Sequence, residues 1–327
     1  MKALTFPEIE KLLFGSLRNE IKDGLFIPHR FAPWQEALFE ATVDSIQKPL
    51  KTKSTASVHL DFLTDATRLE LDCRFVRGST QAPAYIDVYI DGVLKEHVGQ
   101  KTAEEHDARY AFSFGEGEKR VTLFFPNLFG LRIRSLAMDG SFYQPYPKKM
   151  RWLAVGDSIT QGYTTEFPSL SYVNILARKL GAEVVNQAIG GARYKASDIA
   201  EGIPFAPDLI TVAYGTNDWA HGEDLEKNAG EYFTALRRLF PKTPIVAILP
   251  IWRGDVATRP EAKMPFPEAT PILRGVYERF EGVTVVDGAA LVPPLPAFYN
   301  PDTLHPNELG FMHYADGLYE ILRRVTR

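Results

Sequence analysis

The sequence predicts an α/β domain built on a parallel sheet, preceded by an antiparallel β-sandwich. Three observations predict this arrangement. The 327 residues are more than one hydrophobic core usually organises. Over roughly the first 145 residues, apolar and polar side chains alternate with a period of two, which is typical of half-buried strands. After a Pro-rich junction at 143–149, apolar runs of strand length alternate with helical patterns. We therefore expect domains at 1–145 and 146–327.

Composition and charge narrow the function classes. With 45% hydrophobic and 24% charged residues, the chain reads as an ordinary globular protein. Its net charge is −4 and no basic run stands out, so nucleic acid and anionic membrane are poor candidate partners. The sequence has no signal-peptide pattern at its start and no run near the roughly 18 apolar residues of a membrane span. We expect a cytoplasmic protein.

Metal and redox chemistry are not expected either. Cys73 is the single cysteine, which excludes internal disulfides and a CxxC site. No group of His, Asp or Glu has metal-ligand spacing. The sequence therefore predicts a protein without cofactor or metal, and it leaves the oligomeric state open.

The first half carries the strand signals. Leu69, Leu71, Cys73 and Phe75 alternate with charged residues, so Cys73 is expected in a core. Asp91-Gly92 is a strong signal for a two-residue hairpin. Short strands separated by such turns are typical of a sandwich or jelly roll. Residues 6–14 are a candidate helix and 33–40 a candidate turn or strand, and the expected strands are 58–62, 69–75, 86–90, 93–94, 110–114, 121–125 and 131–138.

The second half alternates strands with helices. Strands that are apolar throughout indicate a parallel sheet covered on both faces, and functional groups in such sheets gather at the carboxyl ends of the strands. The expected strands are 152–155, 183–186, 209–213, 245–249 and 283–286, and the expected helices are 171–180, 225–240, 271–280 and 308–324.

Three short segments that contain Gly, Asp, Ser or Asn follow these strands, and a fourth precedes the last helix. They read Gly-Asp-Ser-Ile-Thr-Gln-Gly at 156–162, Asn-Gln-Ala-Ile-Gly-Gly at 186–191, Tyr-Gly-Thr-Asn-Asp at 214–218 and Asp-Thr-Leu-His-Pro-Asn at 302–307. One such segment alone is a weak signal. In this order, the four resemble the consensus blocks of the SGNH/GDSL hydrolase family over roughly 151–327. The resemblance implies a flavodoxin-like three-layer domain with a five-stranded parallel sheet.

The resemblance also implies a catalytic set. A serine hydroxyl needs a base to take its proton, and a carboxylate orients and stabilises that base. By resemblance, Ser158 is the nucleophile, His305 the base and Asp302 its partner. The implied oxyanion donors are the backbone N–H groups of Ser158 and Gly191 and the side-chain amide of Asn217. The spacing after Asn186 favours Gly191 over Gly190, and the choice between them stays open.

Simpler roles compete for several of these residues. Ser158 could cap the following helix, and Asn217 could be a turn residue, although the combined blocks favour the catalytic roles. Asp157 is expected to be a buried, hydrogen-bonding turn residue. Trp219 and Trp252 follow the third and fourth strands, where they could line a substrate pocket or equally well pack between loop and helix.

A β-sandwich before an SGNH domain is similar in layout to two-domain carbohydrate acetyl esterases. Those enzymes often use a reduced catalytic dyad, whereas this chain keeps Asp302. The first hypothesis is a carbohydrate O-acetyl esterase acting on a small ester, with acetylated oligosaccharides as candidates. One alternative is a general short-chain esterase, lipase or thioesterase. A second is an inactive sugar-binding protein on a hydrolase fold, against which the intact catalytic set argues.

Overall fold

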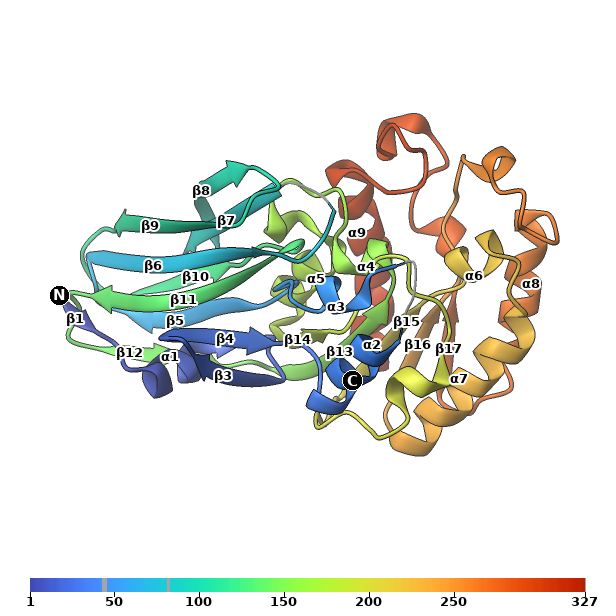
Figure 1. Cartoon of the computed structure of the whole chain (residues 1–327), viewed down its shortest axis with the longest axis horizontal. Coiled ribbons are helices and arrows are strands. Elements are labelled where there is room, and N and C mark those ends of the chain that lie inside the picture. The colour runs from blue at the N-terminus through green and yellow to red at the C-terminus, as the bar shows by residue number, and fades with distance from the viewer. Residues whose placement is uncertain (43–45, 81–82, 327) are drawn as a thin grey trace. The chain divides into compact units, whose positions relative to one another are not determined.

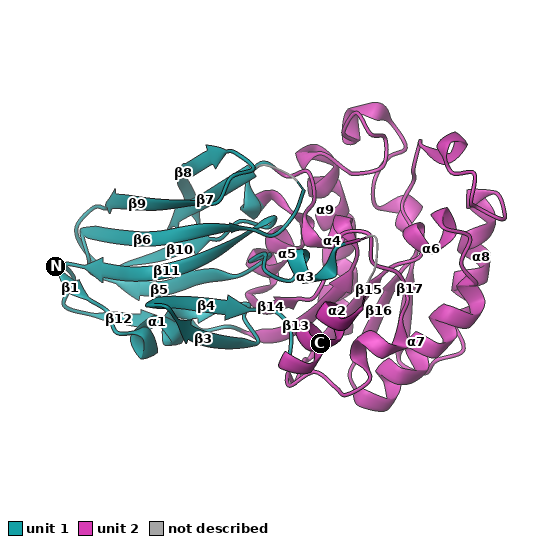
Figure 2. Cartoon of the chain, in the orientation of Figure 1, with its two compact units in different colours: residues 1–32, 47–148, 166–169 teal, residues 33–46, 149–165, 170–327 magenta. Residues whose placement is uncertain are grey.

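The computed structural model describes residues 1–42, 46–80 and 83–326. Two compact units divide the chain, and each takes a short segment from the other half of the sequence (Figure 2). Unit 1 consists of Met1–Ala32, Gln47–Lys148 and Glu166–Ser169. Unit 2 consists of Pro33–Ile46, Lys149–Thr165 and Leu170–Arg327. The division into two contiguous domains at 145/146 stays a prediction.

Unit 1 is the predicted antiparallel sandwich (Figure 1). Its helices are α1 (Phe6–Leu12) and α3 (Lys48–Lys51). The first sheet has the order β3 (Arg18–Lys22), β4 (Leu25–His29), β11 (Phe129–Met138), β6 (Arg68–Arg77) and β9 (His106–Ser113), with β1 (Lys2–Ala3) on β11. The second has the order β12 (Tyr143–Pro145), β5 (His59–Thr64), β10 (Lys119–Phe124), β7 (Pro83–Ile90) and β8 (Val93–Lys101), with β2 (Leu13–Phe14) on β5. Side chains of both sheets form one core, and Cys73 lies fully buried in it, as predicted.

Two Asp-Gly turns shape unit 1. Asp91 and Gly92 join β7 to β8 with φ values of 50° and 80°, the left-handed conformations that a tight hairpin requires. Asp23 and Gly24 join β3 to β4 in the same way, with φ values of 52° and 72°. The first hairpin was predicted and the second was not, although the same dipeptide signals both.

Unit 2 contains the predicted five-stranded parallel sheet. Its order is β14 (Ala182–Asn186), β13 (Met150–Gly156), β15 (Leu209–Ala213), β16 (Ile245–Ile248) and β17 (Val283–Val286). Numbered along the chain this is 2-1-3-4-5, the flavodoxin-like order. The carboxyl ends of β13, β14 and β15 therefore lie next to one another, which brings the loops after these strands together.

Helices complete unit 2. They are α2 (Pro33–Ala41), α4 (Ser158–Gln161), α5 (Tyr172–Leu180), α6 (Thr216–Ala220), α7 (Leu225–Leu239), α8 (Phe266–Tyr277) and α9 (Glu308–Val325). Single 3₁₀ turns of unit 2 lie at η2 (Ala196–Ile199), η3 (Val256–Thr258), η4 (Gly288–Ala290) and η5 (Pro296–Phe298). The turn η1 (Pro168–Leu170) begins in the Glu166–Ser169 segment of unit 1. Helices α5 and α9 pack against each other, and together with alternate residues of the sheet strands they form one core cluster. Helix α7 packs beside α8 (Figure 1).

Several predicted elements differ from the structure. The strand expected at 93–94 runs to Lys101, the strand expected at 110–114 begins at His106, and the helix expected at 6–14 ends at Leu12. Residues 33–40 form helix α2, which belongs to unit 2, and not a turn or strand. Helix α8 begins at Phe266 and not at Pro271, which lies inside the helix. Proline is favoured in the first turn of a helix, and in α8 this proline is Pro267. The prediction instead took Pro271 as the first residue of the helix. No helix in the described part of the chain is long and apolar enough to cross a membrane.

Candidate active site

Ser158 is the first residue of α4, directly after the end of β13. Strand β13 ends at Gly156, where a Cβ atom would lie 2.3 Å from Thr160 Oγ1, so only glycine fits this tight turn. The Ser158 hydroxyl lies 2.8 Å from His305 Nε2. Asp157, not Ser158, caps the helix, because its Oδ1 accepts the backbone N–H of Ile159 at 3.0 Å. The serine side chain is thus left to face the histidine.

Asp302 and His305 lie in the loop before α9. His305 Nδ1 lies 2.6 Å from Asp302 Oδ2, and Asp302 Oδ1 accepts the backbone N–H groups of Leu304 and His305 at 3.0 Å each. Burial by itself would raise the pKa of Asp302. The hydrogen bonds from His305 and Leu304 outweigh it and lower that pKa to about 2. Asp302 is therefore a carboxylate at neutral pH, aimed at the ring nitrogen away from Ser158.

A second set of bonds holds the histidine loop against the loop after α4. The Tyr163 ring lies 4.6 Å from the His305 ring between centroids. Asn300 accounts for most of the polar contacts, since its backbone N–H donates to His305 O at 2.9 Å and its Nδ2 to Thr164 Oγ1 at 2.8 Å. Thr164 Oγ1 also donates to Pro306 O at 3.1 Å. These three residues could not be recognised from the sequence, because the contacts that join the two loops connect positions far apart along the chain.

The loop after β14 carries the two candidate oxyanion glycines. The N–H of Gly190 donates to Gln161 Oε1 at 2.8 Å and is therefore occupied. Gly191 has φ of 83°, and among the described residues its N–H has no hydrogen-bond partner. This difference favours Gly191 over Gly190 as a donor to a bound substrate.

Asn217 lies at the start of α6, after β15. Its Nδ2 atom lies 3.3 Å from Asp157 Oδ2 and 3.2 Å from Ala192 O, both long contacts. The side-chain amide is thus held between the Ser158 turn and the Gly191 loop. Burial raises the pKa of Asp157 to about 6, so this carboxyl takes up a proton at a higher pH than an exposed aspartate does.

Asp218 ties the Asn217 segment to the Gly191 loop. It is fully buried, and its Oδ1 accepts the backbone N–H of Tyr194 at 3.0 Å. Its Oδ2 has no hydrogen-bond partner in the described part of the chain. Burial raises the pKa of this carboxyl to about 7.

The loop after β16 reaches both neighbouring loops. Arg253 Nη1 donates to the carbonyl and the hydroxyl of Thr216, both at 2.9 Å, and its guanidinium binds Asp255 with two bonds of 2.7 and 2.8 Å. The backbone N–H of Gly254 donates to Thr303 O at 2.7 Å. The segment thereby connects the Asn217 loop with the loop of Asp302 and His305.

The two tryptophans differ in their surroundings. Trp219 is buried under the Arg253 guanidinium, edge-on to Phe266, and donates from Nε1 to Met264 O at 2.8 Å. This environment fits the packing alternative. Trp252 is half-buried and edge-on to Tyr299 at 4.8 Å, and its pocket-lining role stays a prediction.

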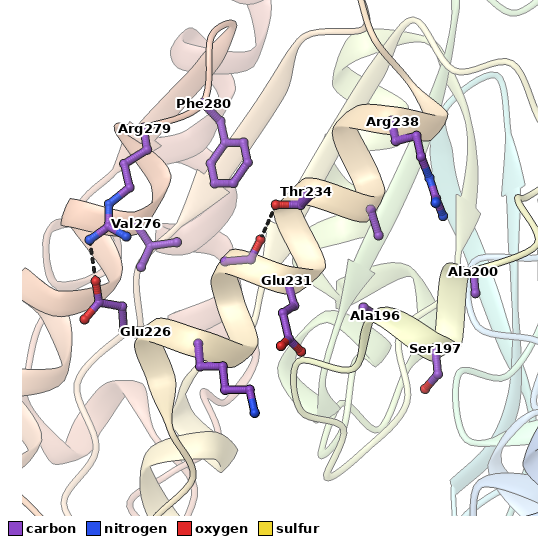
Figure 3. Close-up of a pocket in the computed structure, with 13 residues that line it drawn as sticks. Ala196, Ser197, Ala200, Glu226, Glu231, Thr234, Arg238, Val276, Arg279 and Phe280 are labelled. Carbon is purple, nitrogen blue, oxygen red and sulfur yellow. Dashed lines mark hydrogen bonds and ion pairs between the residues drawn. The ribbon is translucent and has the colours of Figure 1, made fainter.

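Two further features were compared with this site among the described residues of unit 2. The described residues hold no group of three or more His, Cys, Asp or Glu that could bind a metal ion. A hollow of about 740 Å³ lies along α7, bordered by η2 and α8 (Figure 3). Its charged lining residues include Glu226 and Arg279, which pair with each other. None of the residues around Ser158 lines this hollow.

The five-stranded parallel sheet and its helices fit the α/β domain of a GDSL-type hydrolase. Residues 154–312 match the model of the GDSL-like Lipase/Acylhydrolase family. The protein is therefore an enzyme of a class that hydrolyses esters. No curated protein matches the chain.

Solved structures share the two-part fold. Salicylyl-acyltransferase SsfX3 from a tetracycline biosynthetic pathway has a TM-score of 0.78 at 22% identity, covering 96% of this chain and 94% of that one. A protein from Bacteroides ovatus described as a GDSL-like lipase has a TM-score of 0.72 at 18% identity, covering 99% and 97%. A family two carbohydrate esterase from Clostridium thermocellum, in complex with cellohexaose, has a TM-score of 0.61 at 17% identity, covering 82% and 91%.

Proposed function

We propose that this protein is a serine esterase that hydrolyses short acyl esters, with acetyl esters of a small carbohydrate as the first candidates. The observation that carries the proposal is the hydrogen-bond sequence from the Ser158 hydroxyl through His305 to Asp302. A serine, an imidazole and a carboxylate in this order form the arrangement that activates a hydroxyl nucleophile.

The reaction proceeds in two steps. Ser158 Oγ attacks the ester carbonyl while His305 Nε2 takes its proton, and His305 then donates that proton to the departing alcohol as the acyl–Ser158 ester forms. Water, deprotonated by His305, attacks this ester and releases the acid, and the proton returns to Ser158. Asp302 holds the imidazole and stabilises its cation.

Each step passes through a tetrahedral oxyanion. The proposed donors to it are the backbone N–H groups of Ser158 and Gly191 and the Asn217 amide. The N–H of Gly191 has no hydrogen-bond partner among the described residues, which supports its part in this set. The Asn217 amide would exchange its two long contacts for a shorter bond to the developing charge.

The likeness to family two carbohydrate esterases supports a carbohydrate ester, with acetylated oligosaccharides first. A second candidate is acyl transfer, in which an alcohol acceptor takes the place of water. The higher TM-score with the salicylyl-acyltransferase, over nearly the whole of both chains, favours including it. A general esterase, lipase or thioesterase and an inactive sugar-binding protein remain as alternatives.

Phosphonate labelling tests the enzyme. A fluorophosphonate probe should label the wild type and the Ser197→Ala control, whose serine is exposed, but not Ser158→Ala. A wild type that stays unlabelled and inert on 4-nitrophenyl acetate would mean that the protein is not a serine esterase.

Substrate comparison tests the finer assignment. We expect faster hydrolysis of acetyl than octanoyl esters and activity on acetylated xylo-oligosaccharides. Preference for octanoyl esters would instead indicate the lipase-like alternative. Acyl esters appearing on an added alcohol faster than free acid would indicate the transferase.

A further inference from the structure

Helix α2 comes from the first half of the sequence, yet it is built into unit 2 beside the loop that carries Gly191. Trp34 Nε1 donates to Gly202 O at 2.8 Å. The buried amides of Gln35 and Gln187 exchange hydrogen bonds of 3.2 and 3.0 Å, and Gln35 Nε2 also donates to Asp198 O at 2.9 Å. Buried amides paired in this way fix one segment against the other.

The end of the same segment reaches the candidate oxyanion glycine. A Cβ atom on Gly191 would lie 2.9 Å from Ile46 Cγ2 and 3.3 Å from Ile46 Cβ. The Ile46 side chain therefore packs directly on the Cα of Gly191. A β-branched side chain has few rotamers, so it forms a wall that yields little.

We propose that Ile46 bounds the acyl side of the active site and restricts this enzyme to short acyl groups. The inference rests on the proposed function and adds its specificity determinant. The departing alcohol must receive a proton from His305 Nε2, so the alcohol lies on the histidine side of the reacting carbon. The oxyanion, Ser158 Oγ, the leaving oxygen and the acyl substituent are all bonded to that carbon. Once the leaving oxygen faces His305, the acyl substituent is the group left to contact a wall beside an oxyanion donor.

Truncation and enlargement of Ile46 test the proposal with acetyl, butanoyl and octanoyl 4-nitrophenyl esters. Ile46→Ala should raise the ratio of kcat/KM for octanoyl over acetyl by about tenfold or more, with Ile46→Val in between. Ile46→Phe should lower the ratio for butanoyl over acetyl. Val93→Ala, a truncation at an exposed position of unit 1, serves as the control and should leave both ratios unchanged.

A second series keeps the acetyl group and varies the alcohol, and here the Ile46 variants should match the wild type. The proposal is overturned if the acyl ratios stay fixed while Ser158 still reacts with the phosphonate. It is also overturned if only the preference for the alcohol shifts, or if the wild type already prefers octanoyl esters. Should Ile46→Ala not fold, Ile46→Val decides by the same ratios. A wild type without phosphonate labelling would instead remove the proposed function itself.

Discussion

Single side chains set the protonation pattern of the candidate site. Ser158 and His305 are 147 positions apart in sequence and meet because the loop after β13 and the loop before α9 lie at the same edge of the sheet. Asp302, in contrast, is local to the histidine and binds both its ring and its backbone. The base thus depends on one carboxylate for its orientation, while the serine depends on the base for its reactivity.

This order of dependence predicts unequal losses. His305→Ala should lower kcat on 4-nitrophenyl acetate by about 10⁵-fold or more, and Asp302→Ala should cost roughly tenfold to a hundredfold less, because Asp302 only orients and stabilises the base. Steady-state kinetics of both variants at pH 8 measure the difference. An equal or larger loss for Asp302→Ala would mean that this carboxylate has a more direct part in the chemistry.

The buried carboxyl of Asp218 predicts a pH dependence of stability. Its pKa rises from 3.8 to about 7 on burial, so the folded state binds the proton more tightly than the unfolded chain. Its contribution to the free energy of unfolding is therefore present below pH 4 and is lost as the pH rises from about 4 to about 7.

Asp218→Asn keeps an oxygen for the Tyr194 N–H and removes this titration. Between pH 5 and pH 8 the wild type should lose about 2 kcal/mol more of its free energy of unfolding than the variant. Urea unfolding at the two pH values provides the measurement. Parallel pH profiles for the two proteins would show that Asp218 titrates at its ordinary pKa.

At the scale of elements, the loop after β16 organises its neighbours on both sides. Arg253 binds Thr216, next to Asn217, while Gly254 binds Thr303 in the segment between Asp302 and His305. Lysine cannot reproduce the two-bond pairing of the guanidinium with Asp255. The loop is thus placed to position the Asn217 amide.

A double-mutant cycle tests this positioning role. Arg253→Lys should lower kcat by about tenfold in the wild-type background and by little in the Asn217→Ala background. The reason is that Arg253 can position the side-chain amide of residue 217 only where that amide is present. Asn217→Ala alone should cost on the order of 10²–10³ in kcat. If Arg253→Lys lowers kcat by the same factor in both backgrounds, Arg253 acts on stability or on another part of the site.

Elements whose signals are local were predicted from the sequence. The apolar runs of β15 and β17 match their observed bounds, Leu209–Ala213 and Val283–Val286. Hairpin β3–β4 was missed, because Arg18–Lys22 is mostly polar and half-exposed and shows little alternation. Its turn still carries the Asp-Gly signal.

Parts of the candidate site that depend on distant packing were not predictable in this way. Ser158, Asp302 and His305 belong to recognisable blocks, so their proximity could be expected. The contact between Ile46 and Gly191 joins residues from different halves of the chain, and no spacing rule connects them. Arg253 and Asn300 likewise gain their roles from partners on other loops.

For the whole molecule, the exchange of segments between the units has consequences for truncation. A fragment of residues 146–327 lacks Pro33–Ile46, and with it the partner of Gln187 and the wall beside Gly191. We expect this fragment to have no measurable turnover and a lower midpoint in thermal unfolding than the full chain.

A cleavage control separates chain connectivity from the loss of the segment. A protease site inserted at 145–148 and cut after folding should leave activity in place, because helix α2 remains bound to unit 2 through its own contacts. Full turnover by the 146–327 fragment would show that α2 is dispensable.

The lone thiol offers a use that its burial makes possible. Cys73 is fully buried in the sandwich core, and this burial raises its pKa to about 12, so the folded protein presents no reactive thiolate. The rate at which Cys73 is alkylated under native conditions would then measure the opening of unit 1 alone. Together with the rate of phosphonate labelling at Ser158, the rate of Cys73 alkylation gives two separate measurements, one in each unit of the same molecule.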